Sequence, residues 1–584
     1  MKKTLVKFIM VLAAAAPTPG VEVQLADGSR LLGVTSFSSR TRRPIHEFRG
    51  VPFARAPGGS HRFQLPRPVE PLGEFNANWF GPLCPQALSS REMEIPWFTW
   101  PDAGTLAAVR NLSAAEDPED CLHLNVYTPK VDSSARLPVF VFVHGGSFTV
   151  GSSLVARPGF LLDHDVVMVV PEYRLGALGF LFLETEDAPG NLALWDVVEA
   201  LRWTQKNVAM FGGDPSRITL GGNSAGGALS ELLAISPVAD GLFQQVITVS
   251  GTAHAPWSLV AGHRASAAAR RVAAFAGCNS SDAASAVVAC LRNRTLNNIT
   301  IAYRQLCAAD SSECSAAAAA VVQGSWLSAP LLERRPVDAC EAGAGYKPRP
   351  ALGGVTKHDG YYFARDVEKV GADTTTPGGL RLYLEYYFRK AFNVDYNPVI
   401  SSGMRELFFK PQGQNKTANL TISLTDFIGA TQFKGPLMTS ADCNTLHGGK
   451  SYLYTYSHRS SFSVPAIEHA MDLVYLFPRL DYNLTKEEDK VSQRMVHLFA
   501  NFIIYGDPSS NKSKVDNVPT WKSYTPERQE FLRIDWPFRA EEQFEKEFTV
   551  TLREGLNAAA LRLNSPLLVG LGAAVATVTR LHSF

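Results

Sequence analysis

The sequence has no excess of charge of either sign: among 584 residues, 56 lysines and arginines balance 55 aspartates and glutamates. A nucleic-acid-binding surface needs clustered positive charge, and no such run is present. Closely spaced cysteine pairs and histidine clusters of the zinc-binding kind are also missing, as are short-period repeats. With 46% hydrophobic residues, the chain can bury a large core. The composition therefore argues against a nucleic-acid-binding protein, and it implies neither a metal nor an organic cofactor.

The N-terminus has the pattern of a secretory signal. Lys2, Lys3 and Lys7 precede or border the apolar run FIMVLAAAA, and the small residues at 14–16 offer a cleavage site. The run is too short to span a bilayer. We therefore expect residues 1–16 to be a signal peptide.

Cysteines and glycosylation sequons fit an exported chain. An even count of eight cysteines favours disulfides over metal sites in an oxidising compartment. Eight Asn-X-Ser/Thr sequons predict surface glycans. The sequon asparagines are Asn111, Asn279, Asn293, Asn298, Asn415, Asn419, Asn483 and Asn511.

The C-terminal tail, residues 557–584, has two interpretations. A small triplet at 557–559, a spacer and a mildly apolar end resemble a signal for a glycolipid (GPI) anchor. The alternative is an ordinary terminal segment rich in Ala and Gly. The sequence does not decide whether the chain carries this anchor and is attached to a membrane. It also leaves the oligomeric state open.

Apolar runs along the chain predict an α/β fold. Residues 138–146, 165–176 and 243–252 are continuous apolar runs, typical of strands buried on both faces of a parallel sheet. Residues 192–213 have the spacing of an amphipathic helix that ends at glycine. Alternating strands and helices favour a mostly parallel central sheet flanked by helices.

The segment RITLGGNSAGGALSELL contains a G-x-S-x-G pattern around Ser224. The pattern alone is weak, but a β-prone run precedes it and apolar residues at helical spacing follow it. A serine on a sharp turn from strand to helix is the nucleophile of many hydrolases. Ser224 is thus the candidate nucleophile, and Asn223 before it needs an explanation.

A second segment, VFVHGGSF at 141–148, ends a predicted strand with a glycine pair. Backbone N–H groups in such a loop can stabilise an oxyanion, together with the N–H of the residue after the nucleophile. The candidate donors are Gly146, Ser147 and Ala225. Ser147 stands where a third glycine is usual in HGGG-type loops.

Longer blocks carry a resemblance to a known family. They are FRGVPFARAP (48–57), EDCLHLNVYTP (119–129), YRLGALGFL (173–181), NVAMFGGDPSRITLGGNSAGG (207–227) and SGTAHAPW (250–257). In this order they resemble the type-B carboxylesterases and cholinesterases of the α/β-hydrolase fold. The resemblance implies a single catalytic domain, taken here as residues 17–556, that cleaves small carboxylic esters.

The resemblance also implies a catalytic triad in the order Ser, acid, His. VTKHDGYYF (355–363) matches the acid segment and EHAMDLVYLF (468–477) the histidine segment, which assigns Asp359 and His469. Without that context, an Asp before Gly is most often a turn residue and a His beside apolar residues a packed one. The family more often has Glu at the acid position.

The cysteines are organised by the same resemblance. It implies one disulfide between Cys84 and Cys121 and a second between Cys278 and Cys290. A local pair of Cys307 with Cys314 is one interpretation. For Cys340 and Cys443 the sequence leaves the pairing open.

Substrate choice depends on two positions. The family's cholinesterases have Glu immediately before the nucleophile, whereas this chain has the neutral Asn223. Trp257 matches a residue that lines the acyl pocket, although a buried core tryptophan is an equal alternative.

We therefore expect a secreted or cell-surface serine esterase for esters with modest acyl groups. The alternatives are a choline esterase and a cholinesterase-like adhesion protein with little or no turnover.

Overall fold

The computed structural model describes residues 20–86, 118–343, 346–364, 385, 420–460, 466–479 and 482–546. The predicted signal peptide, the predicted anchor signal and the sequons at Asn111, Asn415 and Asn419 lie outside these residues. Within them, no helix is long and apolar enough to cross a membrane.

One large sheet runs through the part of the chain that the structure describes, and β4 pairs with β2 beside its main path. In spatial order the main path is β1 (Val21–Gln24), β2 (Arg30–Phe37), β3 (Pro44–Pro52), β5 (His123–Thr128), β7 (Val167–Pro171), β6 (Leu137–Val143), β10 (Gly213–Asn223), β11 (Gln245–Val249), β14 (Ala351–Thr356), β15 (Ser451–Tyr456), β16 (Phe531–Ile534) and β17 (Arg539–Glu541); β4 is Glu74–Asn76. Every neighbouring pair from β7 to β16 is parallel, whereas the pairs at the two ends of the path are antiparallel. The predicted mostly parallel sheet is confirmed.

The central strands are buried on both faces, which explains their continuous apolar sequences. Val139, Val141 and Val143 of β6 belong to a core that includes residues of α3 (Leu192–Asn207) and α4 (Ala225–Ala234). Phe140 and Phe142 belong to a second core with residues of α17 (Lys486–Tyr505). Successive side chains of a strand point to opposite faces, so a strand with helices on both sides has no polar face.

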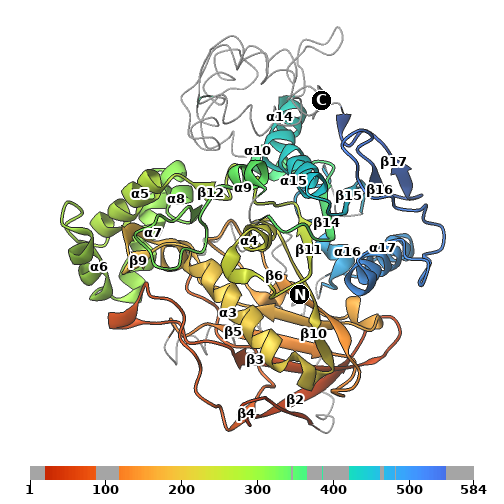
Figure 1. Cartoon of the computed structure of the whole chain (residues 1–584), viewed down its shortest axis with the longest axis horizontal. Coiled ribbons are helices and arrows are strands. Elements are labelled where there is room, and N and C mark those ends of the chain that lie inside the picture. Colours follow the sequence, from red (N-terminus) through yellow and green to blue (C-terminus); the bar gives the residue numbers. More distant parts are fainter. Residues whose placement is uncertain are drawn as a thin grey trace, which may run out of the picture.

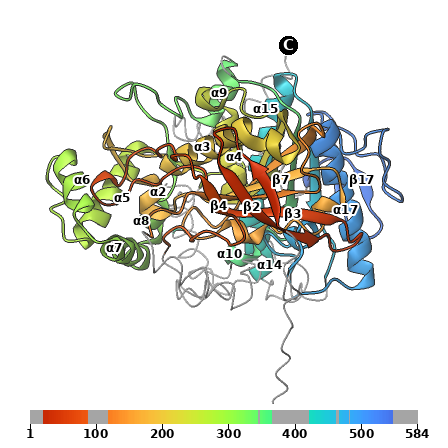
Figure 2. The ribbon, with the colours of Figure 1, turned by 90° about the horizontal axis from the view of Figure 1, so that it is seen from below.

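Further helices extend the molecule beyond the two main layers. Figures 1 and 2 both show α5 to α8 gathered at the end of the molecule opposite α17. The remaining described α-helices are α2 (Gly176–Phe180), α5 (Gly262–Phe275), α6 (Ala284–Arg292), α7 (Leu296–Ala309), α8 (Ser311–Ala316), α9 (Pro336–Ala342), α10 (Tyr361–Ala364), α14 (Leu420–Gly429), α15 (Gly435–Leu446) and α16 (Leu473–Leu476). Two small strand pairs join Phe182–Thr185 to Ala188–Pro189 and Leu259–Val260 to Ala320–Val321.

The helix predicted over 192–213 is shorter in the structure. It ends at Asn207 and continues as a 3₁₀ turn, Val208–Phe211. Gly212 follows with φ of 82°, a left-handed conformation that glycine adopts at little cost and that stops the helix. The next strand, β10, already begins at Gly213, within the predicted helix.

All eight cysteines are disulfide-bonded in the structure. The pairs are Cys84–Cys121, Cys278–Cys290, Cys307–Cys314 and Cys340–Cys443. They include the two pairs that the resemblance implied, and they resolve the two that the sequence left open.

Candidate active site

Ser224 lies on a strained turn between β10 and α4. Its backbone has φ of 52° and ψ of −122°, a combination that non-glycine residues rarely adopt. A β-carbon on Gly222 or Gly226 would overlap the Val143 carbonyl oxygen of the neighbouring strand. Both glycines of the pattern are therefore required by the close approach of β6 to the turn. Ser224 is only 8% exposed, and its hydroxyl makes no hydrogen bond among the described residues.

Asp359 and His469 meet although they are far apart in the sequence. The imidazole Nδ1 lies 2.6 Å from the Asp359 Oδ1, and both side chains are buried. Asp359 occupies the turn after β14, and His469 lies between β15 and α16. The shorter Asp side chain, in place of the family's usual Glu, thus reaches the histidine. Because Nδ1 faces the carboxylate, Nε2 faces away from it.

The other carboxylate oxygen of Asp359 is also fixed. Its Oδ2 accepts a hydrogen bond from the Ser250 hydroxyl at 2.7 Å and another from the Thr356 N–H at 3.0 Å. A buried carboxylate is costly unless its oxygens accept hydrogen bonds, so these donors keep it in place. No motif in the sequence assigned Ser250 a role. Its only signal was its position at the start of the SGTAHAPW block, directly after a strand.

The topology brings these residues to one edge of the sheet. β10, β11, β14 and β15 are adjacent and parallel, so their carboxyl ends lie side by side. Ser224, Ser250 and Asp359 each follow one of these strands. Ligands and reacting groups in open α/β sheets gather at this edge.

The loop after β6 is held by three separate contacts. The His144 ring stacks on Tyr173 with centroids 4.3 Å apart, and the Tyr173 hydroxyl donates to the His144 carbonyl at 2.9 Å. At the far end of the loop, the Gln86 side-chain amide both accepts from and donates to the backbone of Gly151, at 2.9 Å each. Between them, the Gly145 N–H donates to Asn223 Oδ1 at 3.0 Å.

These contacts leave the three predicted oxyanion donors available. Thr149 and Val150 donate their N–H groups to the Gly146 carbonyl oxygen. In contrast, the N–H groups of Gly146, Ser147 and Ala225 donate no hydrogen bond within the described part of the chain. Ser147 has φ of 54°, the conformation that explains why glycine is usual there, and its exposed side chain has room.

Asn223 is a neutral anchor for the oxyanion loop. Its side chain is nearly buried, and the Gly145 N–H can only donate, so the amide oxygen must face the loop. The Asn223 NH₂ group makes no hydrogen bond among the described residues. Asn223 therefore fixes the loop without placing a charge beside Ser224.

Aromatic rings connect the oxyanion loop with the histidine. Trp257 lies with its ring centroid 6.0 Å from Phe148 and 6.1 Å from Phe433, and Phe433 lies 4.9 Å from His469. The Trp257 indole N–H donates to the Gln432 carbonyl at 3.3 Å. Trp257 is half-buried, so it both packs in this cluster and keeps part of its surface accessible. Phe433 lies in a region whose sequence gave few signals.

A second buried carboxyl group, Asp472, lies near the pair. The Tyr454 hydroxyl donates to its Oδ2 at 2.7 Å, whereas Oδ1 is buried without a hydrogen-bond partner. Burial raises the pKa of Asp472 to about 6, and the nearby charge of Asp359 acts in the same direction. With only one donor, Asp472 is a carboxyl group that the fold holds at a cost.

The sheet and its flanking helices define an α/β-hydrolase fold, in which Ser224 lies on the sharp turn from β10 to α4. The comparisons agree: the profile of the Carboxylesterase family matches residues 18–551. The chain belongs to this family, and it is a carboxylic ester hydrolase.

Three relatives show how far the similarity extends. Liver carboxylesterase 1F of Rattus norvegicus is 31% identical over 513 residues, which cover 83% of this chain and 85% of the relative. Juvenile hormone esterase of Tribolium castaneum is 29% identical over 567 residues, which cover 89% of this chain and 88% of the relative. Acetylcholinesterase 1 of Caenorhabditis elegans is 28% identical over 556 residues, which cover 88% of this chain and 83% of the relative.

Replacing Asn223 tests its role as the anchor of the loop. Asn223→Ala removes the acceptor of the Gly145 N–H, so we expect kcat for p-nitrophenyl acetate to fall about tenfold to a hundredfold with little change in KM. Asn223→Asp keeps an acceptor oxygen and should retain far more activity. Equal losses in the two variants would contradict the anchoring role.

Asp472 predicts a pH-dependent stability. Below pH 3.8 the group is protonated in both states and has no effect. Between pH 3.8 and pH 6, Asp472 loses its proton in the unfolded chain but keeps it in the folded protein. Rising pH therefore lowers the free energy of unfolding over this range. Above pH 6 the total loss is about 3 kcal/mol. Asp472→Asn should remove this slope in urea denaturation at pH 4–7. Parallel pH profiles of the variant and wild type would refute the prediction.

Proposed function

We propose that the chain cleaves carboxylic esters through a Ser224–His469–Asp359 triad and an acyl-enzyme intermediate. The observation that carries the proposal is the 2.6 Å contact between His469 Nδ1 and Asp359, buried at the edge of the sheet where Ser224 sits. The carboxylate fixes the imidazole tautomer that leaves Nε2 unprotonated and able to act as a base.

In the first step, His469 takes the hydroxyl proton of Ser224 as the serine oxygen bonds to the ester carbonyl carbon. The carbonyl oxygen becomes an oxyanion, which the N–H groups of Gly146, Ser147 and Ala225 stabilise. Their lack of other acceptors in the described structure supports this role. The intermediate then collapses: the bond to the alcohol oxygen breaks, and His469 returns the proton to the leaving alcohol.

Water repeats the sequence on the acyl-enzyme. His469 removes one proton from the water as its oxygen attacks the acyl carbon, and Ser224 leaves with that proton. The products are the carboxylic acid and the free enzyme. Strain at Ser224, with φ of 52°, is consistent with a residue whose geometry serves chemistry rather than stability.

Trp257 supports a substrate with a modest acyl group. Its partly accessible ring, between Phe148 and Phe433, gives one apolar wall near His469. A wall of large aromatic side chains favours small or slender acyl groups over bulky ones.

A choline ester is the second candidate, because one relative is named acetylcholinesterase 1. Binding a quaternary ammonium group is favoured by aromatic faces and nearby negative charge. Asn223 supplies no charge next to the nucleophile, and its oxygen is occupied by Gly145. This favours neutral esters. An adhesion protein without turnover is disfavoured because Ser224, Asp359 and His469 are all present.

We also propose that the enzyme is exported. A signal peptide at 1–16, four disulfides and five exposed sequon asparagines in the described residues support a secretory route. The five are Asn279, Asn293, Asn298, Asn483 and Asn511. Residues 557–584 would then be either a removed GPI-anchor signal or part of a secreted chain.

A fluorophosphonate probe tests the triad, because it reacts only with an activated serine. We expect the folded wild type to be labelled and Ser224→Ala to be unlabelled. His469→Ala and Asp359→Asn should lower kcat by about 10³-fold or more. Ser230→Ala, a change of a buried serine in the same helix, serves as the matched control. Absence of labelling in folded wild type would overturn the proposal.

The preference for neutral esters is tested with two substrates that share an acyl group. We expect a higher kcat/KM for p-nitrophenyl butyrate than for butyrylthiocholine. Asn223→Asp should raise relative use of the cationic substrate several-fold, because it places a charge of about one unit near the leaving group. Faster hydrolysis of butyrylthiocholine by the wild type would refute the neutral-ester preference.

A further inference from the structure

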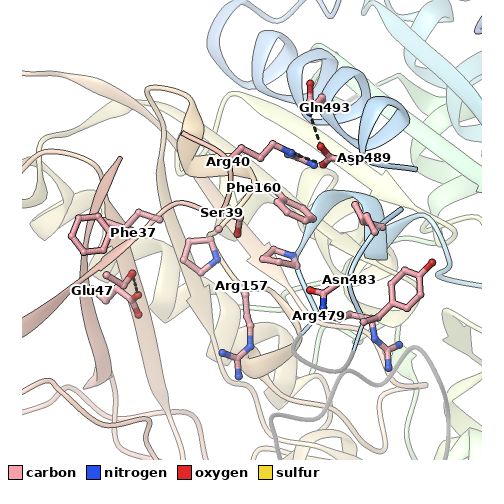
Figure 3. Close-up of a pocket in the computed structure, with 17 residues that line it drawn as sticks. Phe37, Ser39, Arg40, Glu47, Arg157, Phe160, Arg479, Asn483, Asp489 and Gln493 are labelled. Carbon is pink, nitrogen blue, oxygen red and sulfur yellow. Dashed lines mark hydrogen bonds and ion pairs between the residues drawn. The ribbon is translucent and has the colours of Figure 1, made fainter. Parts of the chain in front are cut away.

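A separate cavity of about 720 Å³ lies away from the triad. Figure 3 shows its lining: the β2–β3 hairpin, the segment around Phe160, residues near Arg479 and Asn483, and the first turns of α17. Neither Ser224 nor His469 lines it. The proposed esterase mechanism therefore does not use this cavity.

The wall between the hairpin and α17 is rigid. Arg40 Nε donates to Asp489 at 2.8 Å, and Arg40 Nη2 donates to the Ser492 hydroxyl at 2.5 Å. The same guanidinium lies 3.9 Å above the Phe160 ring. These contacts join segments about 450 residues apart and keep the cavity open between them.

The lining offers both donors and acceptors. Arg40, Arg157 and Arg479 carry positive charge, whereas Glu47 and Asp489 carry negative charge. Both carboxylates are ion-paired, Asp489 with Arg40 and Glu47 with Arg49, so an apolar ligand would bury these charged pairs at a cost. A neutral molecule rich in hydroxyl groups can pair with both kinds of side chain.

Phe37 adds an aromatic face at one end of the cavity. Phe37 is 44% exposed although it is large and apolar, and the Arg42 guanidinium lies 5.1 Å from its ring centroid. Sugar rings present C–H groups on one face, and these pack well on aromatic rings. The lining thus has the mixture of features typical of a carbohydrate site.

A carbohydrate attachment point lies within this same cavity. Asn483 is one of the lining residues, is exposed, and begins the sequon Asn483-Leu484-Thr485. Figure 3 shows its side chain among the lining residues, close to Arg479. The Asn483 amide makes no hydrogen bond among the described residues, so its nitrogen has no competing partner there.

We propose that the cavity seats the N-linked glycan of Asn483, which packs between the β2–β3 hairpin and the first turns of α17. During synthesis, Asn483 Nδ2 loses a proton and bonds to the anomeric carbon of an N-acetylglucosamine, and the diphosphate lipid that carried the sugar leaves. The proposal rests on the proposed export of the chain, but not on the triad.

The test uses the full chain secreted from mammalian cells and a peptide-N-glycosidase applied to the folded protein. Removal of each glycan is followed by mass spectrometry of the resulting deamidated peptides. We expect Asn483 to be glycosylated and to lose its glycan about tenfold more slowly than Asn279 and Asn511, whose side chains are exposed outside the cavity. After denaturation the three rates should be equal.

Phe37→Ala leaves the sequon intact and removes the aromatic wall. It should speed removal at Asn483 several-fold and leave the rates at Asn279 and Asn511 unchanged. An unmodified Asn483, native removal as fast as at the controls, or no effect of Phe37→Ala would overturn the proposal. Ester hydrolysis measured on the same samples separates this outcome from failure of the proposed triad.

Discussion

The buried carboxylate of Asp359 is the constraint on which the site depends. A negative charge with no exposed surface must be surrounded by donors, and this one receives three. Ser250 comes from the end of β11, the Thr356 N–H from the end of β14, and His469 from the connection after β15. The Asp359 carboxylate therefore links the ends of β11 and β14 to the connection that follows β15. Asp472 has a single hydrogen-bond donor, and burial raises its pKa because its charged form is poorly stabilised.

Strain accumulates around that constraint. Five non-glycine residues near the site have positive φ: Ser147, Phe148, Ser224, Ser250 and Ala470. Each such residue costs free energy and persists only when its surroundings hold it. Such contacts are visible for the loop after β6, where Tyr173, Asn223 and Gln86 hold backbone groups of His144, Gly145 and Gly151. The packed core thus maintains unfavourable backbone conformations at the carboxyl ends of the parallel strands.

Much of this architecture could be predicted because its signals are local. Two-sided burial gives β6 and β7 continuous apolar sequences, and the close approach of β6 to the turn requires Gly222 and Gly226. Asp359 and His469 could be assigned only through a family resemblance, since neither residue has a distinctive local pattern. The contact of Ser250 with Asp359 joins positions 109 apart and leaves no periodic trace.

Other features became visible only in the structure, because they depend on contacts between residues far apart in the sequence. Asn223 could be recognised as unusual, yet its partner Gly145 lies 78 residues away. Phe433 lies in a stretch with few sequence signals, and the structure places it beside His469 in the short helical segment Ala430–Lys434 that precedes α15. The Cys340–Cys443 pair was likewise undetermined, because cysteine spacing alone does not encode connectivity.

That last disulfide has a consequence for how the chain withstands proteolysis. It closes a loop of 103 residues that contains Asp359, while Ser224 and His469 lie outside the loop. A single backbone cut anywhere between Cys340 and Cys443 leaves two fragments that are still covalently joined. Asp359 then stays tethered to Ser224 and His469, so a nicked chain migrates as one species until its disulfides are reduced.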